Sequence, residues 1–519
     1  MTAIRTNVHH LLARAAEASP DAPALTYKGE TVTYADTWRA VASVAAHLRE
    51  LGLVREDRVA VYLEKRIETV VALFAASAAG GVFVPVNHVL KSAQVGHILS
   101  DSRARVLITS ADRLGALADV LPHTAVEHLI VVGDVVEPAI DAAVHPWRTA
   151  VAQELIEPAA LDIDPAAILY TSGSTGRPKG VVLSHRNLLA GAESVSTYLQ
   201  NTADDVILSA LPLSFDAGLS QVTTAFSVGA HVVLMNYLVP RDVPKLCARH
   251  GVTGITAVPP LWLQIAEVPW PEAAAERLRY FANTGGRMPR ATLDRLRDTF
   301  PQAAPYLMYG LTEAFRSTYL DPAEVDRRPD SIGKAIPNAE VLVLRPDGTR
   351  CDPGEPGELV HRGALVALGY WNDPVRTAER FRPVHHPDQE WRAPEMAVWS
   401  GDTVVADEDG FLYFVGRADD MIKTSGYRVS PTEVEEAAYS TGLVRDAVAV
   451  GVPDRALGQR VVLIATATQP ELDIPALTAA LRRLLPFYMV PSQIDARTEL
   501  PRSPNGKFDR ALLKAEVPA

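Results

Sequence analysis

The chain has few cysteines and no long apolar run. Of its 519 residues only Cys247 and Cys351 are cysteines, which are too few and too far apart for a disulfide framework or a zinc-binding pattern. No stretch reaches the roughly 18 consecutive apolar residues of a membrane span, and the first residues lack the apolar centre of a signal peptide. We therefore expect two reduced, structural cysteines in a cytoplasmic protein without a membrane partner.

Positive charge is also scarce. The chain carries 50 Lys and Arg against 62 Asp and Glu, which gives a formal net charge of −12. An acidic surface repels the phosphate backbone of DNA and RNA, so we expect no nucleic acid partner. A small nucleotide such as ATP is compatible with this charge, because one local basic loop can override the overall sign.

Strand and helix patterns alternate along most of the chain. Between residues 57 and 110, three short apolar runs typical of buried strands alternate with two helical segments, and the same rhythm resumes after Ile168. This alternation predicts an α/β fold with a doubly wound parallel sheet between helical layers. From Ile336 to Gly363 short strands separated by Gly and Pro turns predict an additional β-rich subdomain.

The last 100 or so residues have a different pattern of helices and strands. They contain two helical patterns, two strand patterns and a polar tail, which is enough for a small α+β domain. We therefore predict a large domain over residues 1–418 and a small one over residues 419–519. No low-complexity linker separates them, so the joint could act as a hinge.

Residues 170–185 form a loop suited to an anion. They read YTSGSTGRPKGVVLSH, and eight of the sixteen are Gly, Ser or Thr. Backbone N–H groups of such a loop can point at one anion, hydroxyls add donors, and Lys179 adds a positive charge. The P-loop pattern G-x-x-x-x-G-K-[ST] is absent. Because an apolar strand ends at Tyr170, we expect a phosphate site at the carboxyl edge of a sheet.

Four further segments follow this loop in order. They are YGLTE (309–313), GELVHRGALVALGYWNDPVRTAERF (357–381), SGDTVVADEDGFLYFVGRADDMIKTSGYRVSPTEVEE (400–436) and PNGKFDR (504–510). Together the five segments resemble, over nearly the whole chain, the signatures of the adenylate-forming superfamily of acyl-CoA synthetases, luciferases and peptide-synthetase adenylation domains. The resemblance implies an enzyme that uses ATP and Mg²⁺. A carboxylate attacks the α-phosphorus of ATP and releases pyrophosphate, and a thiol then attacks the acyl-adenylate.

The resemblance assigns the nucleotide to residues of these motifs. Glu313 would bind Mg²⁺, since a carboxylate supplies the hard oxygen ligands that this cation prefers, and Thr312 would contact the α-phosphate. Tyr309 would stack on adenine, and Asp402 would accept both ribose hydroxyls. The other expected nucleotide contacts are Thr171, Ser172, Gly173, Ser174, Thr175, Gly176, Lys179, Gly285, Gly286, Gly310, Phe414 and Arg417.

Three residues near the carboxyl end also receive roles from the resemblance. Lys507 would reach from the small domain into the cleft and bind both the substrate carboxylate and the phosphate, so with Thr312 and Glu313 it is a candidate catalytic residue. Asp419 would be the hinge about which the small domain rotates between the two half-reactions. Gly426 would line the channel of a phosphopantetheine arm.

The segment LPLSFDAG (211–218) carries information on which class of acid is the substrate. Many CoA ligases of the superfamily have histidine where this chain has Phe215. Phe215 and Asp216 together resemble amino-acid adenylation domains, in which the aspartate holds the substrate ammonium. A buried carboxylate is costly beside an apolar acyl chain but is compensated by an ammonium. Two alternatives stay open, because Asp216 could pair within the protein and because TSGYRVSPTEVEE is closer to the CoA ligases.

The resemblance also assigns other positions to the acid pocket, although these lie in segments that match the superfamily less well. They are Ala217, Ser220, Ala257, Ala282, Thr284, Met308, Arg316 and Ser317. Arg316 is unusual, since a guanidinium facing the pocket would pair with a second carboxylate of the substrate, whereas one facing away would be a structural ion-pair partner. We favour the structural ion pair.

The sequence thus supports two main hypotheses. The first is an enzyme that activates an amino acid and passes it to a separate acyl or peptidyl carrier protein, because no carrier or condensation domain is apparent in the chain. The second is an AMP-forming acyl-CoA synthetase that uses a non-amino acid and free CoA. A binding protein without catalysis is disfavoured because the matched catalytic positions are filled, and nothing supports a luciferase-like oxygenase.

Overall fold

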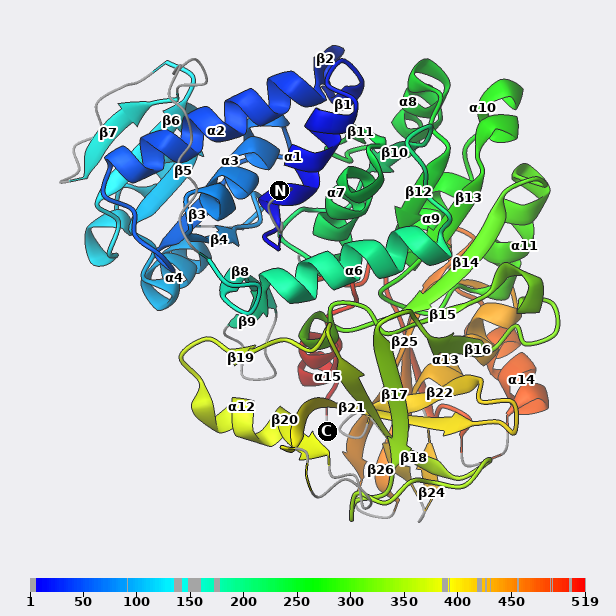
Figure 1. The fold of residues 1–519 in the computed structure, drawn as a ribbon. Helices are drawn as coiled ribbons and strands as arrows, with labels where there is room; N and C mark the ends of the chain where they lie inside the picture. Colours follow the sequence, from blue (N-terminus) through cyan, green and yellow to red (C-terminus); the bar gives the residue numbers. More distant parts are fainter. Residues whose placement is uncertain are drawn as a thin grey trace.

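Three β-sheets organise the part of the chain that the computed structural model describes (Figure 1). The described residues are 6–90, 92–134, 142–147, 160–171, 178–384, 391, 393–417, 422–424, 427–429, 431–454, 457–485, 487, 489–503 and 506–518. Two of the sheets belong to the first four fifths of the chain, and the third to its last fifth.

The first sheet has eight strands and is parallel over most of its width. The six strands from β8 to β7 in the spatial order pair with one another in parallel fashion. At one edge of the sheet β8 pairs with β9, and β9 with β19, in antiparallel fashion. In spatial order its strands are β19 (Gly369–Tyr370), β9 (Lys179–Ser184), β8 (Pro165–Thr171), β4 (Val82–Pro85), β3 (Arg58–Tyr62), β5 (Val106–Ser110), β6 (His128–Val132) and β7 (Ala143–Pro146).

The second sheet has fourteen strands and changes character half-way. The stretch from β11 to β14 is parallel, and the strands beyond it pair in antiparallel fashion. The β-rich region predicted after Ile336 therefore continues this sheet. Its strands are β2 (Glu30–Thr33), β1 (Pro23–Tyr27), β11 (His231–Leu234), β10 (Val206–Ser209), β12 (Gly254–Ala257), β13 (Tyr280–Asn283), β14 (Ala304–Tyr309), β15 (Thr318–Leu320), β16 (Ser331–Ala335), β22 (Leu412–Arg417), β21 (Glu395–Ala406), β18 (Pro356–Gly363) and β17 (Ala339–Leu344), with β20 (Phe381–Val384) paired to β21.

A layer of helices lies between these two sheets, and further helices cover their outer faces. The helix α3 is apolar on all sides and buried from Thr69 to Ala78, as expected of a helix with a sheet on each side. The predicted doubly wound α/β fold is confirmed, with one shared middle layer. That layer holds α1 (His9–Ala18), α2 (Tyr34–Glu50), α3 (Ile67–Ala78), α6 (His185–Tyr198) and α7 (Asp216–Val228). The outer helices are α4 (Ser92–Ser102) and α5 (Ala111–Leu117) on the first sheet, and α8 (Asp242–His250), α9 (Pro259–Ala266), α10 (Glu272–Arg277) and α11 (Arg290–Thr299) on the second.

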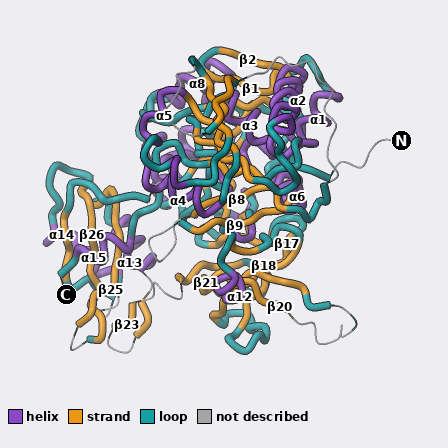
Figure 2. Tube along the Cα trace, turned by 90° about the vertical axis from the view of Figure 1, so that its left-hand side faces the viewer, coloured by secondary structure: helices purple, strands orange, loops and turns teal. Residues whose placement is uncertain are grey.

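The carboxyl-terminal segment forms a sheet of its own with helices on both faces. Figure 2 shows it at one side of the molecule, apart from the two larger sheets. Its strands are β24 (Tyr427–Val429), β23 (Ile422–Thr424), β26 (Gly458–Ala467), β25 (Val444–Asp454) and β27 (Gln493–Ala496), and its helices are α13 (Pro431–Ser440), α14 (Ile474–Leu484) and α15 (Arg510–Glu516). Separate apolar clusters fill the two faces of the sheet. The predicted boundary between residues 418 and 419 lies outside the described residues and stays a prediction.

Both cysteines are free thiols, as the sequence predicted. Cys247 is packed in the core between α8 and the second sheet, where burial raises the pKa of its thiol to about 12. Among the described residues, no helix combines the length and the apolar character that crossing a membrane requires.

The start of α7 is fixed by a close contact at Gly218. A Cβ built on this glycine would come 1.9 Å from the backbone oxygen of Pro212. We expect Gly218→Ala to lower the free energy of unfolding by about 3 kcal/mol or more, because backbone atoms would have to move. Urea titration measures the change. Gly115→Ala on α5, where a Cβ meets nothing within 4 Å, should be neutral or stabilising, and equal losses in both variants would contradict the packing argument.

Candidate active site

Lys179, Glu313 and Tyr370 form a tight polar cluster where β9, η2 (Thr312–Ala314) and β19 meet. The Nζ of Lys179 donates to Oε1 of Glu313 at 3.0 Å and to the hydroxyl oxygen of Tyr370 at 2.8 Å. The Tyr370 hydroxyl donates to the same Glu313 oxygen at 2.7 Å. The predicted phosphate-binding lysine and the predicted magnesium ligand are therefore neighbours.

This cluster keeps Glu313 ionised. Burial raises the pKa of its carboxyl, but the Lys179 charge and the hydrogen bonds from Tyr370 and Lys179 outweigh burial, so the pKa lies below its ordinary value. Among the described residues no group of three His, Cys, Asp or Glu forms a metal site. One carboxylate suits Mg²⁺ nonetheless, because this ion is commonly held by one or two carboxylates together with substrate phosphates. The donor set fits a magnesium nucleotide.

The loop predicted to hold phosphate joins β8 to β9. Thr171 and Lys179 are cross-strand partners at its two ends, and the Thr171 hydroxyl is buried without a hydrogen-bond partner in the described structure. Ser172, Gly173, Ser174, Thr175 and Gly176 lie outside the described residues. The next helix, α6, begins at His185, directly after β9.

Tyr309 has aromatic neighbours and a buried carboxylate around it. Its ring centroid lies 6.2 Å from that of His361, at 17° between the planes, and 6.2 Å from that of Phe414. Its hydroxyl donates to Asp402, which is buried. The residues predicted to contact adenine and ribose are thus joined. His361 was not predicted, and burial lowers the pKa of its ring to about 3, so the ring is neutral.

The remaining nucleotide positions lie on strands of the second sheet or directly after them. Arg417 is the cross-strand partner of Asp402 in the β21–β22 pair. Gly285, at a φ of 75°, and Gly286 follow β13, and Gly310 follows β14. A Cβ on Gly310 would lie 3.3 Å from the Cα of Arg316. The backbone here is thus crowded, and glycine permits it. Asp419 and Gly426 lie outside the described residues.

Lys507 lies against the large part of the chain. A Cβ built on Gly285 would be 3.8 Å from Cε of Lys507, and one built on Gly506 would be 3.8 Å from Val258. The turn that carries Lys507 is closed by Ser503, whose N–H donates to the Lys507 carbonyl oxygen at 2.8 Å. An ion pair between Arg287 and Glu436 of α13 also joins the two parts. The predicted catalytic lysine therefore lies beside the Gly285 turn.

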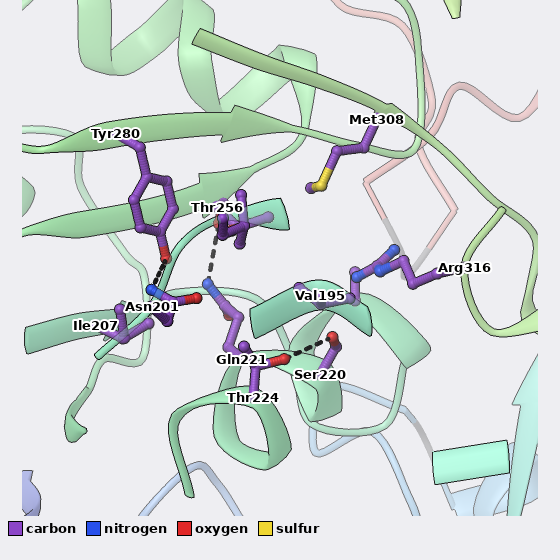
Figure 3. A pocket seen from close by; sticks show the side chains of 12 residues that line it. Val195, Asn201, Ile207, Ser220, Gln221, Thr224, Thr256, Tyr280, Met308 and Arg316 are labelled. Atoms are coloured by element: carbon purple, nitrogen blue, oxygen red, sulfur yellow. Dashed lines mark hydrogen bonds between the residues drawn. The ribbon is translucent and has the colours of Figure 1, made fainter. Parts of the chain in front are cut away.

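A small pocket lies between α6, α7 and the second sheet (Figure 3). Of the positions predicted for the acid, Ala217, Ser220, Met308 and Arg316 line it. Its other lining residues are Val195, Leu199, Asn201, Ile207, Gln221, Thr224, Thr256 and Tyr280. Phe215, Asp216, Ala257, Ala282, Thr284 and Ser317 do not line the pocket. The sequence missed Asn201 and Tyr280, which carry no motif and reach the pocket through folding alone.

Arg316 and Asp216 lie close to each other. Nη1 of Arg316 is 3.8 Å from Oδ2 of Asp216, beyond hydrogen-bonding distance. The same nitrogen donates to Oγ1 of Thr284 at 3.3 Å. Arg316 therefore takes part in an ion pair within the protein and also lines the pocket, and its pairing with a substrate carboxylate stays a prediction.

We expect Tyr370→Phe to destabilise the free enzyme. Tyr370 lies in the GYWN segment of the quoted motif and yet was not predicted as a site residue. A hydrogen bond to a charged group contributes about 1.5–3 kcal/mol, so urea unfolding should show a loss of that order. As a control, Tyr413→Phe removes a hydroxyl that donates to Asp407 at 3.0 Å near the surface and should cost less. Equal losses would contradict a special role for the cluster.

The amino-acid sequence matches a family model over most of its length. Residues 12–371 match the model described as AMP-binding enzyme, and residues 433–507 match that of the AMP-binding enzyme C-terminal domain. The chain belongs to the AMP-binding enzyme family. It is an AMP-forming ligase that activates a carboxylic acid with ATP and Mg²⁺, as the quoted motifs predicted.

Three curated proteins illustrate the range of this family. The chain is 32% identical to a long-chain-fatty-acid–CoA ligase of Salmonella typhimurium, over 98% of this chain and 94% of that protein. It is 34% identical to a feruloyl-CoA synthase of an Amycolatopsis species, over 97% of each. It is 32% identical to part of the linear gramicidin synthase of Brevibacillus parabrevis, over 98% of this chain but 6% of that much longer protein.

Solved structures share the fold. The o-succinylbenzoate CoA synthetase of Bacillus subtilis, in complex with ATP and magnesium ion, is 27% identical to this AMP-binding enzyme. It covers 97% of this chain and 99% of its own, with a TM-score of 0.82. The large and small parts of the chain thus both have counterparts in one solved ligase.

Proposed function

We propose that this AMP-binding enzyme activates a carboxylic acid without an amino group and transfers the acyl group to the thiol of coenzyme A. The observation that carries the proposal is the ion pair at the pocket. Arg316 of the chain itself lies 3.8 Å from Asp216, so Asp216 has a positive partner without a substrate ammonium. Full-length similarity to two CoA ligases supports the same acceptor.

The charged residues are suited to the first half-reaction. The ammonium of Lys179 would hold phosphate oxygens, and that of Lys507 would orient the acid carboxylate beside the Gly285 turn. Two such positive charges stabilise the negative charge that develops when carboxylate and phosphate approach each other. Glu313 would hold Mg²⁺, which when bound neutralises part of the phosphate charge. Asp402 and Tyr309 would fix the ribose and the adenine.

Acid-dependent exchange of labelled pyrophosphate into ATP tests the first half-reaction, and mass spectrometry of the products with CoA tests the second. We expect exchange with one class of non-amino acids and formation of the matching CoA thioester. Exchange with amino acids alone, without any CoA thioester, would contradict the proposal.

A second candidate is the activation of an amino acid for a carrier protein. The Phe215–Asp216 pair and the similarity to a gramicidin synthase favour it. In that case Asp216→Asn should lower turnover of the amino acid by about 100-fold, since a buried ammonium would lose its counter-charge. Unchanged turnover would exclude the ammonium role. The predicted cytoplasmic location belongs to both candidates and stays a prediction.

A further inference from the structure

Arg316 is a buried cation that the protein satisfies only in part. Its side chain is 4% exposed. A guanidinium offers five N–H donors, yet within the described residues Arg316 makes one hydrogen bond, to Thr284. Its Nε is buried and has no hydrogen-bond partner there. Burying a charge is costly unless it is paired and hydrogen-bonded. The N–H donors of Arg316 that lack a partner therefore indicate a site for a ligand.

The guanidinium is aimed into the acid pocket. Figure 3 shows it entering from one side, with Met308 on the neighbouring wall and Asn201 and Tyr280 across the cavity. The residue before Arg316 has an unusual backbone conformation. Phe315 has a φ of 53° and is fully buried, with its ring packed where a side chain on Gly191 would stand. Non-glycine residues rarely adopt this conformation, and it commonly persists at functional sites.

The position of Arg316 relative to Lys507 limits the ligand. Its hydrogen-bond partner Thr284 directly precedes Gly285, beside which Cε of Lys507 lies. Arg316 and Lys507 therefore both lie beside the Thr284–Gly285 segment, which favours a short acid over a long one. The rest of the wall is mainly apolar, and its polar side chains Asn201, Gln221 and Tyr280 hydrogen-bond to partners within the protein.

We propose that Arg316 binds a second carboxylate of the substrate, so that the acid activated by this enzyme is a short dicarboxylic acid. The inference rests on the proposed acid–thiol ligase activity and names its substrate class. A carboxylate can accept two parallel hydrogen bonds from a guanidinium, the pairing that its planar fork favours. Asp216, too distant for a hydrogen bond, balances the arginine charge while the pocket is empty and leaves the donors available.

The test compares each diacid with its own mono-methyl ester, which keeps the length and one carboxylate but removes the second charge. Short diacids from three to six carbons and aromatic ortho-diacids form the panel. With the native enzyme we expect kcat/KM for pyrophosphate exchange to be about 100-fold higher for the preferred diacid than for its ester, because the ester offers no second carboxylate to the unfilled N–H donors of Arg316. Equal values for diacid and ester would overturn the inference.

Variants of Arg316 test whether the preference for the diacid over its ester depends on this residue. Arg316→Gln should reduce the diacid-to-ester ratio to near one, chiefly through KM, while Arg316→Lys should keep part of it. Arg290→Gln, an exposed arginine on α11, should keep all of it. If Arg316→Gln does not fold, the diacid-to-ester ratios of the native enzyme and of Arg316→Lys still test the inference. A native ratio near one with CoA thioesters formed would refute the dicarboxylate alone, whereas absence of exchange with every acid would refute the ligase function.

Discussion

Lys507→Ala should lower the rate of acid-dependent pyrophosphate exchange by about 10²–10³-fold, the loss found when one preorganised donor is removed from a developing negative charge. Lys507 is exposed on a turn of the small part of the chain, yet its Cε lies beside Gly285 of the large part. It is therefore suited to hold the carboxylate and the α-phosphate together. The loss should appear in kcat for exchange at saturating acid and ATP.

Two controls distinguish this role from a structural one. Lys514→Ala, at an exposed position of α15, should leave exchange unchanged. The predicted rotation of the small domain should withdraw Lys507 from the site in the second half-reaction. Thioester formation from a chemically prepared acyl-adenylate should therefore proceed at the native rate in Lys507→Ala. Equal losses in the two half-reactions would contradict an adenylation-specific role.

Local elements of this fold could be predicted from sequence because their signals are local. The hairpin around Lys28 and Gly29 follows from two β-rich runs, and both turn residues have positive φ. The helix α2 ends at Glu50, shortly before Gly52, and glycine is common just after the end of a helix. The joining of the β-rich region to the parallel strands could not be predicted. It depends on the pairing of β16 with β22, which are far apart in sequence.

In the candidate site, too, the sequence predicts which residues are present but does not predict how they are arranged. Motifs predicted Lys179, Glu313, Asp402 and Lys507 as site residues, because the resemblance assigns each of these chemical groups a role in the use of ATP. The motifs did not indicate that Lys179 and Glu313 pair with each other in the free enzyme. Nor could they decide the direction of Arg316, since side-chain direction depends on how the chain folds around it.

Glu313→Gln should lower kcat/KM for MgATP by about 100-fold and raise the Mg²⁺ concentration needed for half-maximal exchange. The substitution keeps the size of the side chain but removes the charge that a hard divalent cation prefers. It also leaves the Lys179 ammonium without its carboxylate partner at 3.0 Å. Titration of exchange activity with Mg²⁺ at fixed ATP measures the first effect. Glu276→Gln, on an exposed face of α10, is the matched control and should behave as the native enzyme.

The stability of the free enzyme gives an independent measure of the same carboxylate. The folded-state pKa of Glu313 is lowered, because Lys179 and Tyr370 outweigh the effect of burial. A lowered pKa stabilises the fold at pH values above the unfolded pKa of about 4.3, and this contribution is lost as the pH falls through the folded pKa. The free energy of unfolding of Glu313→Gln should thus fall below the native value at pH 7, and the difference should shrink as the pH falls below about 4. A difference independent of pH would show that the Lys179–Glu313 pair does not stabilise the free enzyme, because the loss would then come from packing and not from charge.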